Sequence, residues 1–234
     1  MTVAPLLAGT AAAAYLAGAW SVPWRRRRTA SFVAGTAVLA AAPLVPSASL
    51  AGHMTEHALL IGVAAPLLVL GAPGALAMRA LPPRARGACV ALLRSRAAAV
   101  VAHPAVTWSL FVAVQWTFHV TPLIEASETR PALHAFEHVA FVAAGILFWV
   151  PVIGSNPVPR RLGGAERSLY LFFAVPAVDM AGVALMARGE EAAGVAMLAG
   201  SLPVVLGAIV VTWRWIVSEE RRAVLLENTH GAPS

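Results

Sequence analysis

Long apolar runs alternate with short polar segments along the whole chain. A run of roughly 17–25 apolar residues is long enough to cross a bilayer as a helix. Seven such runs occur, at about 3–21, 29–46, 53–73, 98–119, 133–152, 168–187 and 192–214. The pattern therefore predicts an all-α, polytopic membrane helix bundle of seven transmembrane helices. It forms a single transmembrane domain over residues 1–215, followed by a short tail over 216–234.

The composition fits this interpretation. The chain is 59% hydrophobic and 12% charged, with a mean hydropathy of +0.75, whereas soluble domains carry about 25% charged residues. The net charge of +6 would also suit a nucleic-acid partner. However, the arginines fall in short loops, where membrane topology explains them, so we expect a lipid bilayer and no nucleic acid as the partner. The single cysteine, Cys89, excludes an internal disulfide.

The basic residues predict an orientation. Fifteen of the seventeen arginines lie in the first, third and fifth connections and in the tail, while Arg130 and Arg188 lie on the other side. Positive charge concentrates in cytoplasmic loops. We therefore expect the N-terminus outside and the C-terminus in the cytoplasm. The last two runs are separated only by Arg188-Gly189-Glu190-Glu191, which predicts a very tight turn.

One motif carries candidate chemistry, because it occurs twice at the head of an apolar run. The two copies of H-x-x-E-H are His53-Met54-Thr55-Glu56-His57 and His134-Ala135-Phe136-Glu137-His138. Residues four apart lie on one face of a helix, so each pair of histidines can hold a metal ion. Titratable groups are costly near lipid and usually have a function there.

With the predicted topology, a fifth histidine joins these four at the outer face. His119 closes the fourth run at the same membrane face, whereas His103 begins that run on the inner side and His230 lies in the tail. Imidazole binds copper, zinc and iron well. The candidate metal ligands are His53, His57, His119, His134 and His138.

Several other residues near these histidines or within the apolar runs have more than one interpretation. Glu56 and Glu137 either orient the neighbouring imidazoles, bind the metal directly or complement a helix dipole. Gln115 lies one turn before His119 and can share its face. Asp179, in the middle of the sixth run, is either a proton or metal group or the partner of a polar residue on another helix. For Met54 and Met180 we expect packing rather than metal binding.

Three stretches of the sequence are similar to one known family. The chain resembles the CtaG-like cytochrome c oxidase assembly proteins in His53–His57 with Ala65–Pro73, in His103-Pro104 with Trp116–Glu125, and in Leu133–His138 with Phe148–Gly154. Weaker similarity follows in Arg167–Phe172 and Ala193-Gly194. One departure is the short connection before the last run, which is often longer in such proteins.

The resemblance implies a seven-helix protein of the bacterial plasma membrane that helps to mature the copper-containing part of cytochrome c oxidase. It carries the five outer-face histidines onto motif positions. We therefore expect an assembly factor rather than an enzyme, which binds copper at these histidines and has oxidase subunits as its partners.

Three alternatives remain open at this point. Copper uptake would use the same site but requires a path through the membrane. Only Asp179 and Gln115 indicate such a path. A haem-binding electron carrier would use histidines of the third and fifth runs, but haem takes two axial residues, which is fewer than the five histidines at this face. H-x-x-E-H is also the inverted zincin pattern of a zinc-dependent protease, but that site needs one copy and a distant third ligand.

Overall fold

The computed structural model describes residues 3–46, 49–155, 157–158 and 160–230, and this part of the chain is all-helical. The elements in chain order are α1 (Val3–Ser21), α2 (Arg26–Ala41), a 3-10 turn (Ala42–Leu44), α3 (Leu50–Ala58), a π-helical segment (Leu59–Ala64), α4 (Ala65–Leu70), α5 (Pro73–Ala80), α6 (Pro83–Leu93), α7 (Arg96–Val101), α8 (Pro104–Val120), α9 (Leu123–Thr129), α10 (Pro131–Ile153), α11 (Gly164–Met186), α12 (Glu191–Gly200) and α13 (Leu202–His230).

Four helical stretches in the described residues are long and apolar enough to cross a membrane. They are Leu50–Ala80, Pro131–Ile153, Gly164–Met186 and Glu191–Glu227. Helix α2 has 16 residues and α8 has 17, so both are short for a span. Proline limits both helices, because Pro43 follows α2 in the 3-10 turn and Pro104 starts α8 afresh after α7. The seven-span count therefore stays a prediction.

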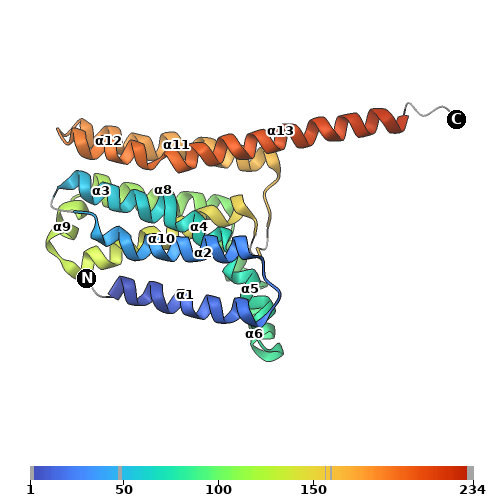
Figure 1. Cartoon of the computed structure of the whole chain (residues 1–234). Helices are drawn as coiled ribbons and strands as arrows, with labels where there is room; N and C mark the ends of the chain where they lie inside the picture. Colours follow the sequence, from blue (N-terminus) through green and yellow to red (C-terminus); the bar gives the residue numbers. More distant parts are fainter. Residues whose placement is uncertain (1–2, 47–48, 156, 159, 231–234) are drawn as a thin grey trace.

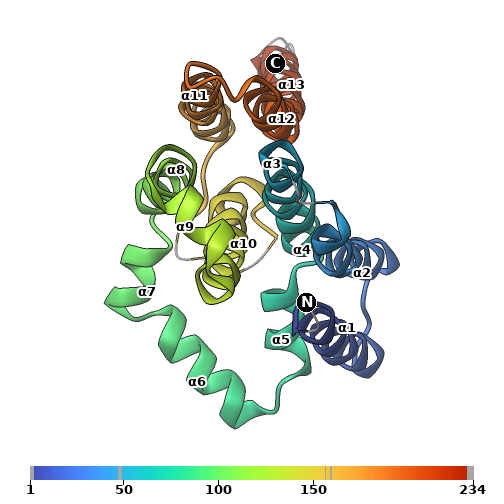
Figure 2. The ribbon, with the colours of Figure 1, turned by 90° about the vertical axis from the view of Figure 1, so that its left-hand side faces the viewer.

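The helices pack in layers around α10 (Figures 1 and 2). Helices α11, α12 and α13 form one outer layer, and α1 lies at the opposite side beyond α2. Viewed along the bundle, α10 lies among α8, α3 and α4, while α5, α6 and α7 form an arc that leaves the bundle and returns to α8. The core is aromatic where α8 meets α10, with the rings of Phe111 and Phe148 stacked at 4.1 Å.

Small residues let neighbouring helices approach closely. A Cβ placed on Gly194 of α12 would lie 2.6 Å from the carbonyl oxygen of Gly182 on α11, and one on Gly35 of α2 would lie 2.9 Å from the backbone nitrogen of Leu68 on α4. Close contacts of this kind drive association of membrane helices, since lipid and side chain are equally apolar. The turn before α12 is tight as predicted, with Gly189 at a φ of 88°.

The third and seventh predicted runs are less regular than the sequence pattern indicates. The third run passes through the π-helical segment, where the N–H of Ala65 bonds to the carbonyl of Leu60. The next residue, Pro66, has no N–H to donate, so the wider turn precedes a position that cannot complete an ordinary α-helical bond. The seventh run breaks at Ser201 into α12 and α13. Helix α13 then continues past Trp215 to His230, so the tail begins as helix, and its residues 231–234 lie outside the described chain.

Candidate metal centre

The two motifs lie on facing helices, α3 and α10. Helix α3 begins earlier than predicted, because the Ser49 hydroxyl accepts a hydrogen bond from the Gly52 N–H at 3.2 Å and caps the helix there. His53 is therefore in the second turn of α3 rather than at its start. Helix α10 likewise begins at Pro131, ahead of His134. Both glutamates thus lie beyond the first turn, where a role as helix-dipole partner is weak.

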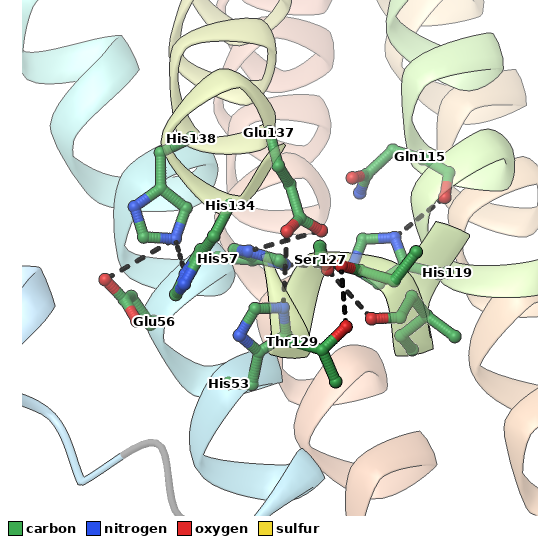
Figure 3. A network of polar contacts seen from close by, with 12 residues as sticks. His53, Glu56, His57, Gln115, His119, Ser127, Thr129, His134, Glu137 and His138 are labelled. Carbon is green, nitrogen blue, oxygen red and sulfur yellow. Dashed lines mark hydrogen bonds and ion pairs between the residues drawn. The ribbon is translucent and has the colours of Figure 1, made fainter. Parts of the chain in front are cut away.

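The structure brings all five predicted histidines together (Figure 3). The rings of His53 and His57 are 4.2 Å apart, and those of His134 and His138 are 4.3 Å apart. The two pairs approach each other, with 5.1 Å between the rings of His53 and His134. His119 reaches the group from α8, its ring 5.3 Å from that of His57.

The glutamates are exchanged between the two motifs. Glu137 of α10 lies against the histidines of α3, with its Oε2 3.6 Å from Nε2 of His53 and its Oε1 3.7 Å from Nε2 of His57. Glu56 of α3 lies against α10, with its Oε1 3.6 Å from Nε2 of His138. Glu137 therefore serves the other copy of the motif, whereas Glu56 lies against His138 of the other copy and also within ligand range of His53 in its own.

These distances suit a shared metal ion better than direct hydrogen bonds. The four atoms His53 Nε2, His57 Nε2 and Glu137 Oε1 and Oε2 are buried, and none has a hydrogen-bond partner in the described structure. Two ligands at about 2.1 Å from one tetrahedral ion lie roughly 3.4 Å apart, close to the observed 3.6 and 3.7 Å. A buried polar group without a partner is costly, so a cation between these atoms would remove several penalties at once.

His119 orients His57 rather than joining this group. Its Nδ1–H donates to the backbone carbonyl of Gln115 at 2.7 Å, which leaves Nε2 of the neutral ring as an acceptor 3.2 Å from Nδ1 of His57. His57 Nδ1–H can donate to it, and Nε2 of His57 is then free to bind a cation. A hydrogen bond to the far nitrogen of this kind fixes the tautomer of a metal-binding imidazole.

A second group of possible ligands adjoins the first. Among the described residues, two sets offer three ligand atoms within 4.8 Å of one another: His53, His57 and Glu137, and His53, Glu56 and His134. His138 belongs beside the second set, because its Nε2 lies 2.8 Å from Nε2 of His134. Each glutamate, which the sequence left between accessory and direct roles, is thus part of a set that could hold a metal ion.

Burial differs between the two sets. The side chains of His53, His57 and Glu137 are 3%, 2% and 0% exposed, whereas that of His138 is 20% exposed. Phe141 covers one side of the buried set, with its ring 4.4 Å from that of His57. Phe141 lies one turn after Glu137 on the same face of α10, but its contact with His57 depends on how α3 and α10 pack.

The remaining polar residues lie outside both sets. Gln115 is buried on α8 with Oε1 unpartnered, and Asp179 on α11 is half-buried with Oδ1 unpartnered in the described structure. Met54 packs in the core as expected, while Met180 is 53% exposed. His103 caps the start of α8, its Nδ1 accepting from the Ala105 N–H, as predicted. The side chain of His230 lies outside the described residues.

The fold and this centre define a helical membrane protein with buried histidine and carboxylate groups that could hold a metal. Residues 13–192 match the family of cytochrome c oxidase caa3 assembly factors (Caa3_CtaG), and the chain belongs to this family. The resemblance seen in the sequence is thereby confirmed.

Curated relatives come from mycobacteria. Uncharacterized proteins of Mycobacterium bovis and Mycobacterium tuberculosis are each 30% identical over 214 residues, covering 79% of this chain and 32% of the relative. An uncharacterized protein of Mycobacterium leprae is 35% identical over 147 residues, covering 60% of this chain and 22% of the relative. The chain thus spans about a third or less of the length of these relatives. No solved structure matches it.

Proposed function

We propose that the protein is an assembly factor of the bacterial plasma membrane that binds copper between α3 and α10 and supports its delivery to cytochrome c oxidase subunits. The observation that carries this proposal is the buried group formed by His53, His57 and Glu137, whose facing nitrogen and oxygen atoms have the spacing of metal ligands and no hydrogen-bond partner in the described structure. Membership of the oxidase assembly family supports cytochrome c oxidase as the recipient of the copper.

The donor atoms fit copper as the cargo. Imidazole nitrogen with carboxylate oxygen suits Cu(II), and also zinc, whereas Cu(I) prefers thiolate and thioether sulfur. Met54 is the methionine within the motif, and it packs in the hydrophobic core. The centre would thus hold copper as Cu(II), with His119 setting the tautomer of His57.

The proposed topology has seven spans, an external N-terminus and a cytoplasmic C-terminus. Its support is the arginine distribution together with the place of the histidines. Fifteen of seventeen arginines lie in the predicted cytoplasmic segments, whereas the metal centre adjoins α9, at the end of the bundle remote from the C-terminus (Figure 1). Copper would therefore be taken up from the outer side.

The test is the double substitution His57→Ala and His138→Ala, with His103→Ala as the matched control. Alanine suits a membrane helix, so the protein should still insert. Copper bound to the purified double variant should fall sharply, and cells should make oxidase polypeptide with little copper and low activity. Added copper should partly restore that activity. Normal copper binding and oxidase activity in a stably expressed double variant would refute the proposal.

Copper uptake is the second candidate, because a small cavity of about 20 Å³ adjoins the centre. It lies among α3, α8, α11, α12 and α13, and its lining includes His57, Gln115, Met197 and Ser201. An uptake protein would raise the copper content of cells or vesicles that contain it. An assembly factor would instead change the copper content of the oxidase alone.

The geometry weighs against the zincin alternative and restricts the haem alternative. In a zincin the glutamate of the motif is a general base beside its own histidines, but here Glu137 contacts the histidines of the other motif and Glu56 pairs with His138 of the other motif. Two axial ligands of haem iron lie about two metal–nitrogen bonds apart, roughly 4 Å. The Nε2 atoms of His134 and His138 are only 2.8 Å apart, so this pair cannot lie on opposite faces of one haem, and a haem here would need one histidine from α3 and one from α10.

A further inference from the structure

His53 belongs to both sets of possible ligands. It lies between Glu137 on one side and the Glu56–His134 pair on the other (Figure 3). We call His53, His57 and Glu137 the deep subsite, and Glu56, His53 and His134, with His138 beside them, the outer subsite. The two subsites are thus adjacent and share one ligand.

The subsites differ in how they can be reached. The deep subsite is closed by Phe141 and by His119, which engages the far nitrogen of His57. His134 and His138 are only half-buried, and they are the two least buried side chains of the cluster. His134 is the fourth residue of α10, close to the end of the helix that begins at Pro131. An ion from outside therefore meets the outer subsite first.

The outer subsite also has an unsatisfied buried group of its own. Glu56 is 2% exposed, and its Oε1 has no hydrogen-bond partner among the described residues. The Nε2 atom of His138 lies 3.6 Å from this oxygen. A buried carboxylate in this position favours a cation beside it, as Glu137 does in the deep subsite.

We propose that the centre is a two-step relay, in which a divalent ion binds first at the outer subsite and is then passed by His53 to the deep subsite, one ion at a time. The inference rests on the proposed metal binding and deepens it. One neutral imidazole presents one lone pair, so His53 serves one subsite at any moment. The ion keeps His53 as a ligand while Glu56 and His134 are exchanged for Glu137 and His57.

The experiment measures Cu(II) stoichiometry, affinity and loading rate of the purified full chain in detergent. Glu137→Gln removes the deep carboxylate, Glu56→Gln removes the outer one and His53→Ala removes the shared ligand. Glu125→Gln, at an exposed position of α9, is the matched control. Thermal unfolding compared with the control shows whether each variant is folded.

The relay predicts one ion per chain in the unchanged protein. Glu56→Gln should keep its affinity but load at least about tenfold more slowly, while Glu137→Gln should still bind one ion, about tenfold or more weakly, and release it faster to a chelator. His53→Ala should show both defects, slow loading and weak binding, because it lacks the ligand that the two subsites share. His134→Ala should load as slowly as Glu56→Gln.

Two results would overturn the relay. Two ions per chain would mean independent subsites, and loading of Glu56→Gln and His134→Ala at the rate of the control would remove the outer step. Both would leave the proposed function intact. Absence of Cu(II) binding by the unchanged protein would instead refute the proposed function itself, so the two failures are distinguishable.

Discussion

Glu137 Oε2 lies 3.6 Å from Nε2 of His53, although the two residues come from different copies of the motif and from different helices. The centre consequently exists only when α3 and α10 are packed against each other. Its ligands are preorganised by helix packing, and a bound ion would in turn hold the two helices together. Metal binding and the stability of this helix pair should therefore be coupled.

The first prediction concerns His119. Changing it to alanine should weaken metal binding by about 10–100-fold without changing the number of ions bound, because His57 loses the partner that fixes its tautomer. Competition with a chelator of known affinity measures the effect. His103→Ala, at the start of the same helix, should bind normally, and equal affinities for the two variants would show that His119 has no part in the centre.

A second prediction is topological. A reporter fused after Glu227 should be active only in the cytoplasm, and one inserted near Ser127 only outside, since the arginines favour the cytoplasmic side. An external C-terminus would place the metal centre at the inner face and would remove the outer origin of the copper.

A third prediction tests the close packing of α11 against α12. Gly194→Val should destabilise the protein by about 1–3 kcal/mol, because overpacking forces the helices apart. Its Cβ would lie 2.6 Å from the carbonyl oxygen of Gly182, whereas one on Gly9 would have no atom within 4 Å. Thermal unfolding in detergent should thus show a lower midpoint for Gly194→Val than for the control Gly9→Val. Equal midpoints would contradict this packing.

The fourth prediction concerns metal preference. With imidazole and carboxylate donors, the purified protein should bind Cu(II) and Zn(II) more tightly than Cu(I), and Cu(II) more tightly than Zn(II). Competition titrations under oxidising and reducing conditions measure both differences. A clear preference for Cu(I) would require sulfur ligands. Met54 rather than Glu137 would then be the expected metal ligand.

Local pattern was sufficient to predict much of the fold. Apolar runs located the long helices but not α5, α6 and α9, the Arg188–Glu191 segment gave the turn, and four-residue spacing placed His53 with His57 and His134 with His138 on single faces. These features depend on residues close together in sequence. The α-helical class and the capping role of His103 follow from the same local rules.

The exchange of glutamates was beyond local pattern. Whether Glu137 faces His138 or His53 depends on how α3 and α10 pack, and nothing in either pentapeptide fixes that contact. The same holds for the break at Ser201 and for the arc of α6 and α7, in which no residue is buried. The count of spans also depends on where proline interrupts a run, which hydropathy alone does not register.

The most direct test is metal analysis of the purified full chain after loading with Cu(II), combined with X-ray absorption at the copper edge. The unchanged protein should retain copper with nitrogen and oxygen neighbours at about 2.0–2.1 Å, as imidazole and carboxylate ligands give. The double variant His57→Ala and Glu137→Gln should lose most of that copper while the control Glu125→Gln keeps it. Equal copper content and identical spectra for the two variants would contradict a centre built from His53, His57 and Glu137.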